Sequence, residues 1–330
     1  MYKRQSASTL LQEARSLNAT VFVDRELGRG RSEFSVPPGA ELRNLISQSA
    51  ARALGAIGPN WRLQPPSAPA RVQLHDPEWA KSPEDSATRL WEQFESHQPS
   101  TLSVESGSLS LEVSDTRAIV SNGFDNHYPS SKLQLAARVR AKGGAPVMMH
   151  LDARHQADIR WQAAFADALQ RSQRAQAAIP NESGAYDLLL LSSAYRPRGD
   201  ADYGLWTALV HQCNARLAAA GLARYQVGQE ILASPARGDA LSIRSDGARD
   251  YGWRSAPFDN DGHAVRRFSI VENGKAAGHS LRYSEAAQKG VEANGGVRDL
   301  VMDSGTRSIE QLGTPDDRPL LVVHEIENLH

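Results

Sequence analysis

The sequence predicts an α+β fold in two parts: an N-terminal α/β domain with antiparallel strands and helices over residues 1–180, and a C-terminal β-rich domain with inserted helices over residues 181–330. Its 330 residues are about twice the usual length of one domain. Apolar residues recur at helical spacing in some segments and alternate as in strands in others. The boundary is predicted at Ile179-Pro180 and the polar run Asn181–Gly184, because proline disfavours helix at the residue before it.

The first 60 residues predict a helix, a β-hairpin and a second helix. Apolar spacing predicts a short helix over Thr9–Ser16. β-branched and aromatic residues predict a strand at Ala19–Val23, and the polar run Asp24–Ser32 predicts a turn into a second strand at Phe34–Val36. Helical spacing returns at Leu42–Leu54.

The middle of the first domain predicts a linker, a helix and an antiparallel sheet. Residues 59–83 are rich in proline, which suits neither a helix interior nor a central strand, so we expect a surface linker. A helix is predicted over Pro83–Phe94. Alternating residues at Leu109–Val113 and Lys132–Arg140, with the turn Ser121-Asn122-Gly123 between them, predict antiparallel strands.

A long helix closes the first domain, and strands dominate the second. Alanine-rich helical spacing predicts the helix Ile159–Ile179. The apolar run Tyr186–Leu191 predicts a strand buried on both faces, and Leu205–Leu222 predicts the next helix. Frequent turn residues then predict short strands, with a helical piece at Ser284–Gly290 and a last strand at Leu320–Val323.

Composition and charge exclude several classes of protein. The 37 Lys+Arg and 38 Asp+Glu residues leave a net charge of -1, which argues against a nucleic-acid partner. The single cysteine, Cys213, can form neither an intrachain disulfide nor a cysteine-rich zinc module. No stretch approaches the length of about 18 apolar residues that a membrane span needs. We therefore expect a cytoplasmic protein without a membrane span.

Sequence motifs reveal no catalytic, cofactor-binding or metal site. The HExxH and HExxxH patterns of metallopeptidases and the GxSxG pattern of serine hydrolases are missing. The acidic run Phe258–Gly262 predicts a tight turn, because the glutamate that a calcium loop needs six residues after its glycine is absent. His211 and Cys213 are two residues apart on a predicted helix, so they point to different faces and cannot share a metal through that helix.

Several segments nevertheless occur in the order typical of one family. They are Asp115–Gly123, Gly184–Leu190, Gly228–Ser234, Phe258–Gly262, Arg267–Lys275, Ser284–Ala287 and Asn294-Gly295-Gly296. They are similar to the N-S-x-G turn, the G-x-Y-D-V-V-L strand, the G-x-x-V-A-S segment, the FDxEG turn, the strand and xxNG hairpin after it, and the small-residue helix with a glycine-rich end that characterise the TldD/PmbA family. The sequence thus resembles this family over roughly its last two thirds, and the resemblance implies a barrel-like C-terminal domain.

The resemblance implies a heterodimeric peptidase. In it the TldD-type subunit carries HExxxH and a later cysteine as zinc ligands, and the PmbA-type subunit, also called TldE, carries neither. The zinc helix of the family would correspond to Leu205–Leu222, where this chain has His211, Gln212 and Arg216. Gln212 replaces the glutamate base with an amide, and Arg216 replaces the second histidine with a side chain that stays protonated. The resemblance therefore implies a subunit without metal or cofactor, and zinc in a TldD-type partner.

The expected function is that of a non-catalytic TldE-like subunit that binds and helps to cleave extended peptides, as in leader removal from ribosomally made peptides. Two alternatives stay open: a self-sufficient hydrolase with an unrecognised site, and a peptide-binding scaffold protein. The expected partners are a TldD-like metallopeptidase subunit and a peptide, with a homodimer as the alternative when the chain is alone. Family members continue beyond the strand that matches Leu320–Ile326, so we expect an incomplete C-terminal domain.

Overall fold

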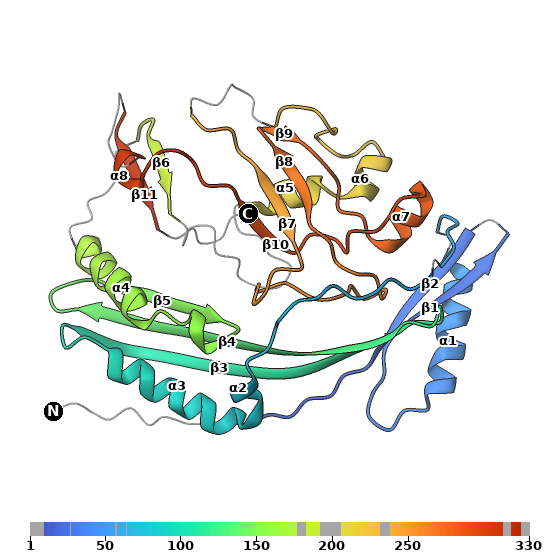
Figure 1. The fold of residues 1–330 in the computed structure, drawn as a ribbon, viewed down its shortest axis with the longest axis horizontal. Helices are drawn as coiled ribbons and strands as arrows, with labels where there is room; N and C mark the ends of the chain where they lie inside the picture. Colours follow the sequence, from blue (N-terminus) through green and yellow to red (C-terminus); the bar gives the residue numbers. More distant parts are fainter. Residues whose placement is uncertain are drawn as a thin grey trace. The chain divides into compact units, whose positions relative to one another are not determined.

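The computed structural model (Figure 1) describes residues 10–26, 28–56, 58–63, 65–176, 183–191, 206–231, 238–312 and 318–324. Internal contacts divide the chain into two compact units, Met1–Gln64 with Ala287–Val291 and Pro65–Ala286 with Glu292–His330. The boundary expected near residue 180 falls within the second unit and outside the described residues, so it stays a prediction.

The first unit contains a β-hairpin and a helix, as predicted. Strands β1 (Asn18–Arg25) and β2 (Gly28–Ser35) pair antiparallel, and α1 (Leu42–Gly55) follows them. The predicted turn Asp24–Ser32 is wrong in extent, because most of this polar run pairs within the hairpin and the turn lies between Arg25 and Gly28. The hairpin register overrides the local preference of polar residues for turns.

The predicted helix at Thr9–Ser16 is wrong for the residues that the structure describes. Residues 10–17 have no helical structure, and Leu10 and Leu11 are 87% and 69% exposed. A short helix gains most of its stability from packing of its apolar face, and these leucines bury little.

Helix α1 and strand β2 approach each other closely at Gly30. A Cβ atom added at Gly30 would lie 1.8 Å from the backbone oxygen of Ala53, which is fully buried in α1. The contact is with backbone, so it cannot be relieved by a side-chain rotation. Glycine is therefore required at this position for the helix to lie against the hairpin.

We expect Gly30→Ala to lower the free energy of unfolding by about 1–3 kcal/mol, because the added methyl group forces the helix and strand apart. Gly55→Ala is the matched control: nothing lies within 4 Å of its added Cβ, at the last residue of α1. Alanine is a better helix former than glycine, so the control should be neutral or slightly stabilising. Urea denaturation of the two variants measures the difference, and equal stabilities would show that this close approach is incorrect.

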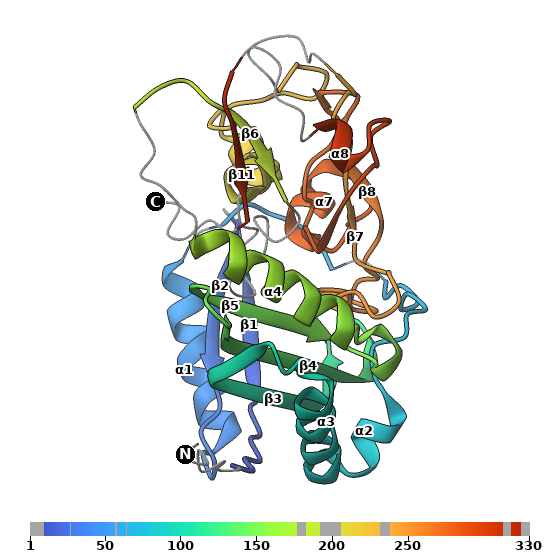
Figure 2. The same cartoon turned by 90° about the vertical axis from the view of Figure 1, so that its left-hand side faces the viewer.

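A three-stranded antiparallel sheet forms the framework of the second unit (Figure 2). Strands β3 (Leu102–Ile119) and β4 (Asp125–Ala141) form a long hairpin, and β5 (Pro146–Ala153) pairs with the other edge of β4. The predicted turn is confirmed, since the Gly123 N–H donates to Val120 O and the Val120 N–H donates to Phe124 O. The sequence analysis missed β5, placing the end of the sheet at Gly143-Gly144.

Helices α2 (Pro77–Lys81), α3 (Pro83–His97) and α4 (Trp161–Gln176) cover one face of this sheet. Both longer helices were predicted; the expected end of α4 at Ile179-Pro180 lies outside the described residues. Their buried residues follow helical spacing and meet alternate residues of β4 and β5. The resulting core comprises Trp79, Leu90, Phe94, Leu102, Leu133, Leu135, Ala137, Val139, Met149, Leu151, Ala153, Ile159, Trp161, Phe165 and Ala168.

The proline-rich linker is largely irregular, as expected, but it is not confined to the surface. Leu74 and Asp76 at its end are 3% and 2% exposed. Asp76 caps α2, because its Oδ1 accepts hydrogen bonds from the backbone N–H groups of Glu78 and Trp79. Its Oδ2 accepts from the N–H of Gln156 at 2.8 Å, which joins the linker to the short helix η1 (Gln156–Asp158) before α4.

The C-terminal part has two small sheets. Strands β7 (Ile243–Asp246), β8 (Phe268–Glu272), β9 (Lys275–Ala276) and β10 (Asp299–Met302) form an antiparallel sheet in the order β10-β7-β8-β9. Strands β6 (Asp187–Leu190) and β11 (Leu320–Val323) pair in parallel. Helices α5 (Thr207–Gln212), α6 (Ala215–Ala219), α7 (Tyr283–Lys289) and α8 (Ile309–Leu312) accompany them.

These elements confirm the α+β class and correct three details. A barrel-like domain is not supported, because the strands of the described C-terminal residues form separate small sheets and close no barrel. Strand β6 is not buried on both faces, since Asp187 and Leu188 are exposed and β11 is its partner on one edge. No helix among the described residues is long and apolar enough to cross a membrane.

Candidate functional site

The predicted helix Leu205–Leu222 is interrupted at Cys213 and Asn214, which separate α5 from α6. Asn214 has an extended backbone conformation, and its side chain caps α6 by accepting a hydrogen bond from the N–H of Arg216 at 2.8 Å. A neighbouring segment fills the break: the Ser280 N–H donates to Cys213 O at 2.7 Å, and the Ala215 N–H donates to Ser280 O at 3.2 Å. Asparagine is a favourable N-cap, so the break has a local cause.

The break separates the three residues that correspond to the family's zinc helix. His211 and Gln212 end α5, and Arg216 lies in α6. His211 is exposed, and the Gln212 side-chain oxygen accepts a hydrogen bond from the N–H of Arg224. One imidazole, an amide engaged with backbone and a guanidinium do not make a donor set that suits zinc.

Arg216 instead forms an ion pair with α7. Its Nη2 donates to Oε1 of Glu285 at 3.0 Å. The Glu285 side chain is 10% exposed and the Arg216 side chain 69%, so the carboxylate is buried beneath a largely solvated guanidinium. The other carboxylate oxygen of Glu285, Oε2, is buried and makes no hydrogen bond among the described residues.

The ion pair lines a polar hollow of about 100 Å³. Its walls are Asn214, Arg216, Ser280, Arg282 and Glu285. Two guanidinium groups and one carboxylate give this hollow a formal charge of +1. We regard it as the candidate functional site because it joins a buried polar atom without a partner to exposed cations.

Asn294 holds the segment that carries Ser280 and Arg282. Its Oδ1 accepts hydrogen bonds from the N–H groups of Leu281 and Gly296, at 2.9 and 3.2 Å. Its Nδ2 donates to His279 O at 2.9 Å, and Asn294 is only 7% exposed. The sequence analysis used Asn294 only as part of a family resemblance; an asparagine followed by two glycines, both with positive φ, is the signal that could have indicated its role.

Cys213 is a buried structural residue. It is 5% exposed, and its Sγ donates to Gly278 O at 3.1 Å. Burial raises the pKa of the Cys213 thiol to about 11, so the thiolate that a nucleophile needs is scarce at neutral pH. Among the described residues, no three His, Cys, Asp or Glu side chains are grouped to hold a metal ion.

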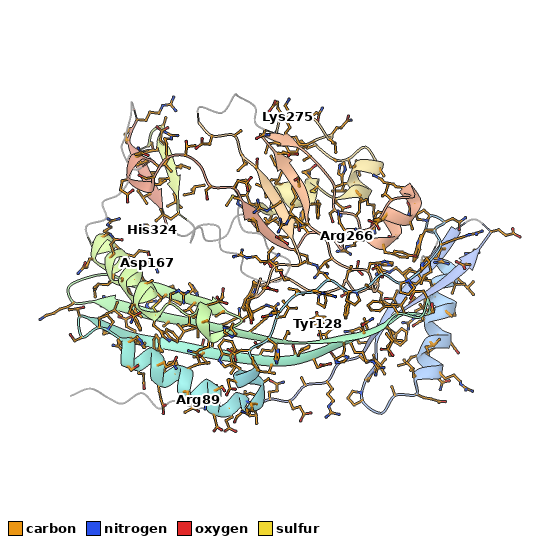
Figure 3. The ribbon with its side chains drawn as sticks, viewed as in Figure 1. Arg89, Tyr128, Asp167, Arg266, Lys275 and His324 are labelled. Carbon is orange, nitrogen blue, oxygen red and sulfur yellow. The ribbon has the colours of Figure 1, made fainter. Side chains whose placement is uncertain are left out.

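The acidic run Phe258–Gly262 is a tight turn, as predicted. Oδ1 of Asp259 accepts hydrogen bonds from the N–H groups of Asp261 and His263, at 3.0 and 2.9 Å. The Phe258 ring makes edge contacts with Phe124 and with Tyr128, which lies on β4 (Figure 3). The turn therefore anchors the C-terminal segment on the long hairpin.

His263, directly after this turn, stacks on Tyr283 at the start of α7. The ring centroids are 4.1 Å apart with an interplanar angle of 9°. His263 is 6% exposed and its Nε2 has no hydrogen-bond partner among the described residues. Burial lowers the pKa of His263 below 6.5, and the nearby Asp259 carboxylate opposes this effect.

We expect His263 to make the protein less stable in acid. Because its pKa is lowered in the folded state, the unfolded chain binds more protons, and stability falls as the pH drops through 6.5 and below. His263→Phe keeps a ring on Tyr283 but cannot titrate, so its loss of stability between pH 7.5 and about pH 5.5 should be smaller than that of the parent. Urea midpoints at the two pH values measure this; equal shifts in both proteins would contradict the assignment.

The fold and the site define a protein of mixed α+β class with a polar hollow next to an interrupted helix. Structures with the same fold are known at low identity. One from Thermotoga maritima, described as a candidate modulator of a DNA gyrase, has a TM-score of 0.73 and 18% identity over 95% of this chain and 72% of that chain. TldE from Thermococcus kodakarensis has a TM-score of 0.68 and 16% identity over 93% of this chain and 77% of that chain.

A third structure, from Bacteroides thetaiotaomicron and also described as a candidate gyrase modulator, has a TM-score of 0.65 and 17% identity over 90% of this chain and 72% of that chain. Residues 202–330 match the PmbA/TldA metallopeptidase C-terminal domain. No significant match is found among curated proteins. The chain therefore belongs to the TldD/PmbA family, with the sequence match in its C-terminal part and the likeness in fold over most of its length.

Proposed function

We propose that this chain is a non-catalytic, TldE-like subunit that pairs with a TldD-type zinc metallopeptidase and helps it to bind and cleave extended peptides. The observation that carries this proposal is the Arg216–Glu285 ion pair. A guanidinium bound to a carboxylate occupies the position that corresponds to the second zinc histidine. Such a group neither ligates zinc nor activates water.

The long sheet offers a surface that suits an extended peptide. Strand β3 lies at one edge of the sheet order β3-β4-β5, and most of its residues are exposed or half-buried. A peptide can add to such an edge through main-chain hydrogen bonds, which accept many sequences. We infer that this edge contributes to peptide binding, including that of leader peptides on ribosomally made precursors.

In this proposal zinc belongs to the TldD-type partner, where it would polarise the scissile carbonyl and activate water. This chain supplies binding surface and no metal ligand. The proposed setting is the cytoplasm, in keeping with a chain whose single cysteine is a buried thiol. Without the partner, the chain is expected to self-associate as a homodimer.

Co-expression with a TldD-type chain from the same genome tests the proposal. We expect cleavage of a leader-bearing peptide by the pair and by neither chain alone. His211→Ala in this chain should leave cleavage by the pair unchanged, whereas replacement of the HExxxH glutamate of the partner should abolish it. Cleavage by this chain alone would favour the self-sufficient hydrolase; peptide binding without any dependence of the TldD-type chain on it would favour the scaffold.

A further inference from the structure

The buried carboxylate oxygen in the polar hollow lacks a donor. Oε1 of Glu285 is bound by Arg216 at 3.0 Å, whereas Oε2 is buried and has no hydrogen-bond partner among the described residues. Buried acceptors are nearly always satisfied, because leaving one unpaired costs its desolvation free energy. A ligand that binds here should therefore present an N–H group to Oε2.

The same hollow has unused positive charge. Arg282 forms no ion pair among the described residues, and Arg216 is 69% exposed with only part of its guanidinium engaged by Glu285. Guanidinium groups match carboxylates in geometry and can bind them through two parallel hydrogen bonds. A ligand should therefore also bring a negative charge.

We propose that this hollow binds a carboxylate with an N–H group next to it: the C-terminal residue of a peptide or a free amino acid. The carboxylate lies against Arg282 and the free part of Arg216, and the adjacent N–H group donates to Glu285 Oε2. The peptide form of this inference rests on the proposed function; the chemistry of the hollow does not.

Other small ligands fit the hollow less well. A divalent cation would meet two guanidinium groups and a single carboxylate, which is too few oxygen ligands and the wrong charge. Phosphate or sulfate would suit the arginines but would place its oxygens against the unpaired Glu285 oxygen. Only a ligand that carries a donor beside its anionic group satisfies both sides.

The hollow is formed before any ligand binds. Asn214 caps α6 and pairs with Ser280, and Asn294 holds the backbone on the other side of Ser280. The side chains of Arg216 and Glu285 are joined across α6 and α7. A preformed site loses little conformational entropy on binding, which favours recognition of a small group.

The test is calorimetric titration of the purified full-length chain with three probes. N-acetyl-Ala-Ala offers a carboxylate and an amide N–H, its C-terminal amide lacks the carboxylate, and free L-alanine offers carboxylate and ammonium. Binding of N-acetyl-Ala-Ala identifies the peptide C-terminus as the source, and binding of free alanine alone identifies an amino acid. Binding of neither probe, or equal binding of the C-terminal amide, overturns the inference.

Variants place the binding at the hollow. Arg282→Gln should weaken binding by about tenfold or more, because a charge-assisted hydrogen bond to the carboxylate is lost. Arg282→Lys should restore part of it. Arg249→Gln, which removes an exposed charge outside the hollow, is the matched control and should have no effect. Equal effects of Arg282→Gln and Arg249→Gln would overturn the inference.

The outcome is independent of the peptidase experiment. If N-acetyl-Ala-Ala or alanine binds and the TldD-type chain cleaves peptides without this chain, the proposed function fails and the carboxylate site stands. If the pair is required for cleavage and neither probe binds, the proposed function stands and the carboxylate site fails.

Discussion

Phe94→Ala is expected to lower the free energy of unfolding by about 3–5 kcal/mol, the usual cost of removing a large buried aromatic side chain. Phe94 is 1% exposed and lies at the centre of the core between the long sheet and its helices. Its ring contacts those of Trp91, Phe165 and Trp161 at centroid distances of 5.1, 5.3 and 6.1 Å. Alanine removes these contacts and leaves a cavity between α3 and α4.

Two variants make this measurement specific. Phe94→Leu keeps most of the buried volume and should cost clearly less than Phe94→Ala. Leu222→Ala removes a large side chain that is 69% exposed and should change the urea midpoint very little. A loss for Phe94→Ala no larger than that for Leu222→Ala would show that Phe94 does not lie in the core.

Asn294→Ala is expected to have the next largest effect, centred on the candidate site. The substitution leaves the N–H groups of Leu281 and Gly296 and the carbonyl of His279 without their side-chain partner. If each buried group left unpaired costs about 1–3 kcal/mol, the three together cost about 3 kcal/mol or more. The segment that carries Ser280 and Arg282 should then open locally before the chain unfolds.

Amide hydrogen exchange measures this opening directly. Exchange at Leu281 and Gly296 should accelerate in Asn294→Ala, while exchange in β4 is expected to change less. Asn260→Ala alters an exposed asparagine of the same unit and serves as the control. Unchanged protection of the Leu281 amide in Asn294→Ala would contradict the role that we assign to this side chain.

Much of the fold could be predicted because it depends on local patterns. The apolar spacing in α1, α3 and α4 and the alternation in β3 and β4 each correspond to a face that is buried in the structure. The turn residues at 121–123 and 273–274 also lie where predicted. Predictions failed where tertiary contacts decide the outcome. The leucines before Leu17 find no buried surface, and the helix after residue 205 is broken by an asparagine cap and by pairing with Ser280.

The candidate site was less accessible to sequence reasoning. The family resemblance drew attention to Arg216, but its partner Glu285 is 69 residues away along the chain. No spacing rule joins residues on two short helices whose contact depends on the segment between them. Asn294 was missed as a structural residue for the same reason: its three hydrogen bonds go to backbone groups of two separate turns.

The zinc content of the pair purified after co-expression tests the central claim most directly. We expect one zinc ion per pair, retained in His211→Ala and lost when a histidine of the partner's HExxxH motif is replaced. This chain purified alone should hold no stoichiometric zinc, because Gln212 and Arg216 cannot replace the glutamate and histidine of a zinc-water site. One tightly held zinc ion per chain in the isolated protein, lost on His211→Ala, would contradict the account.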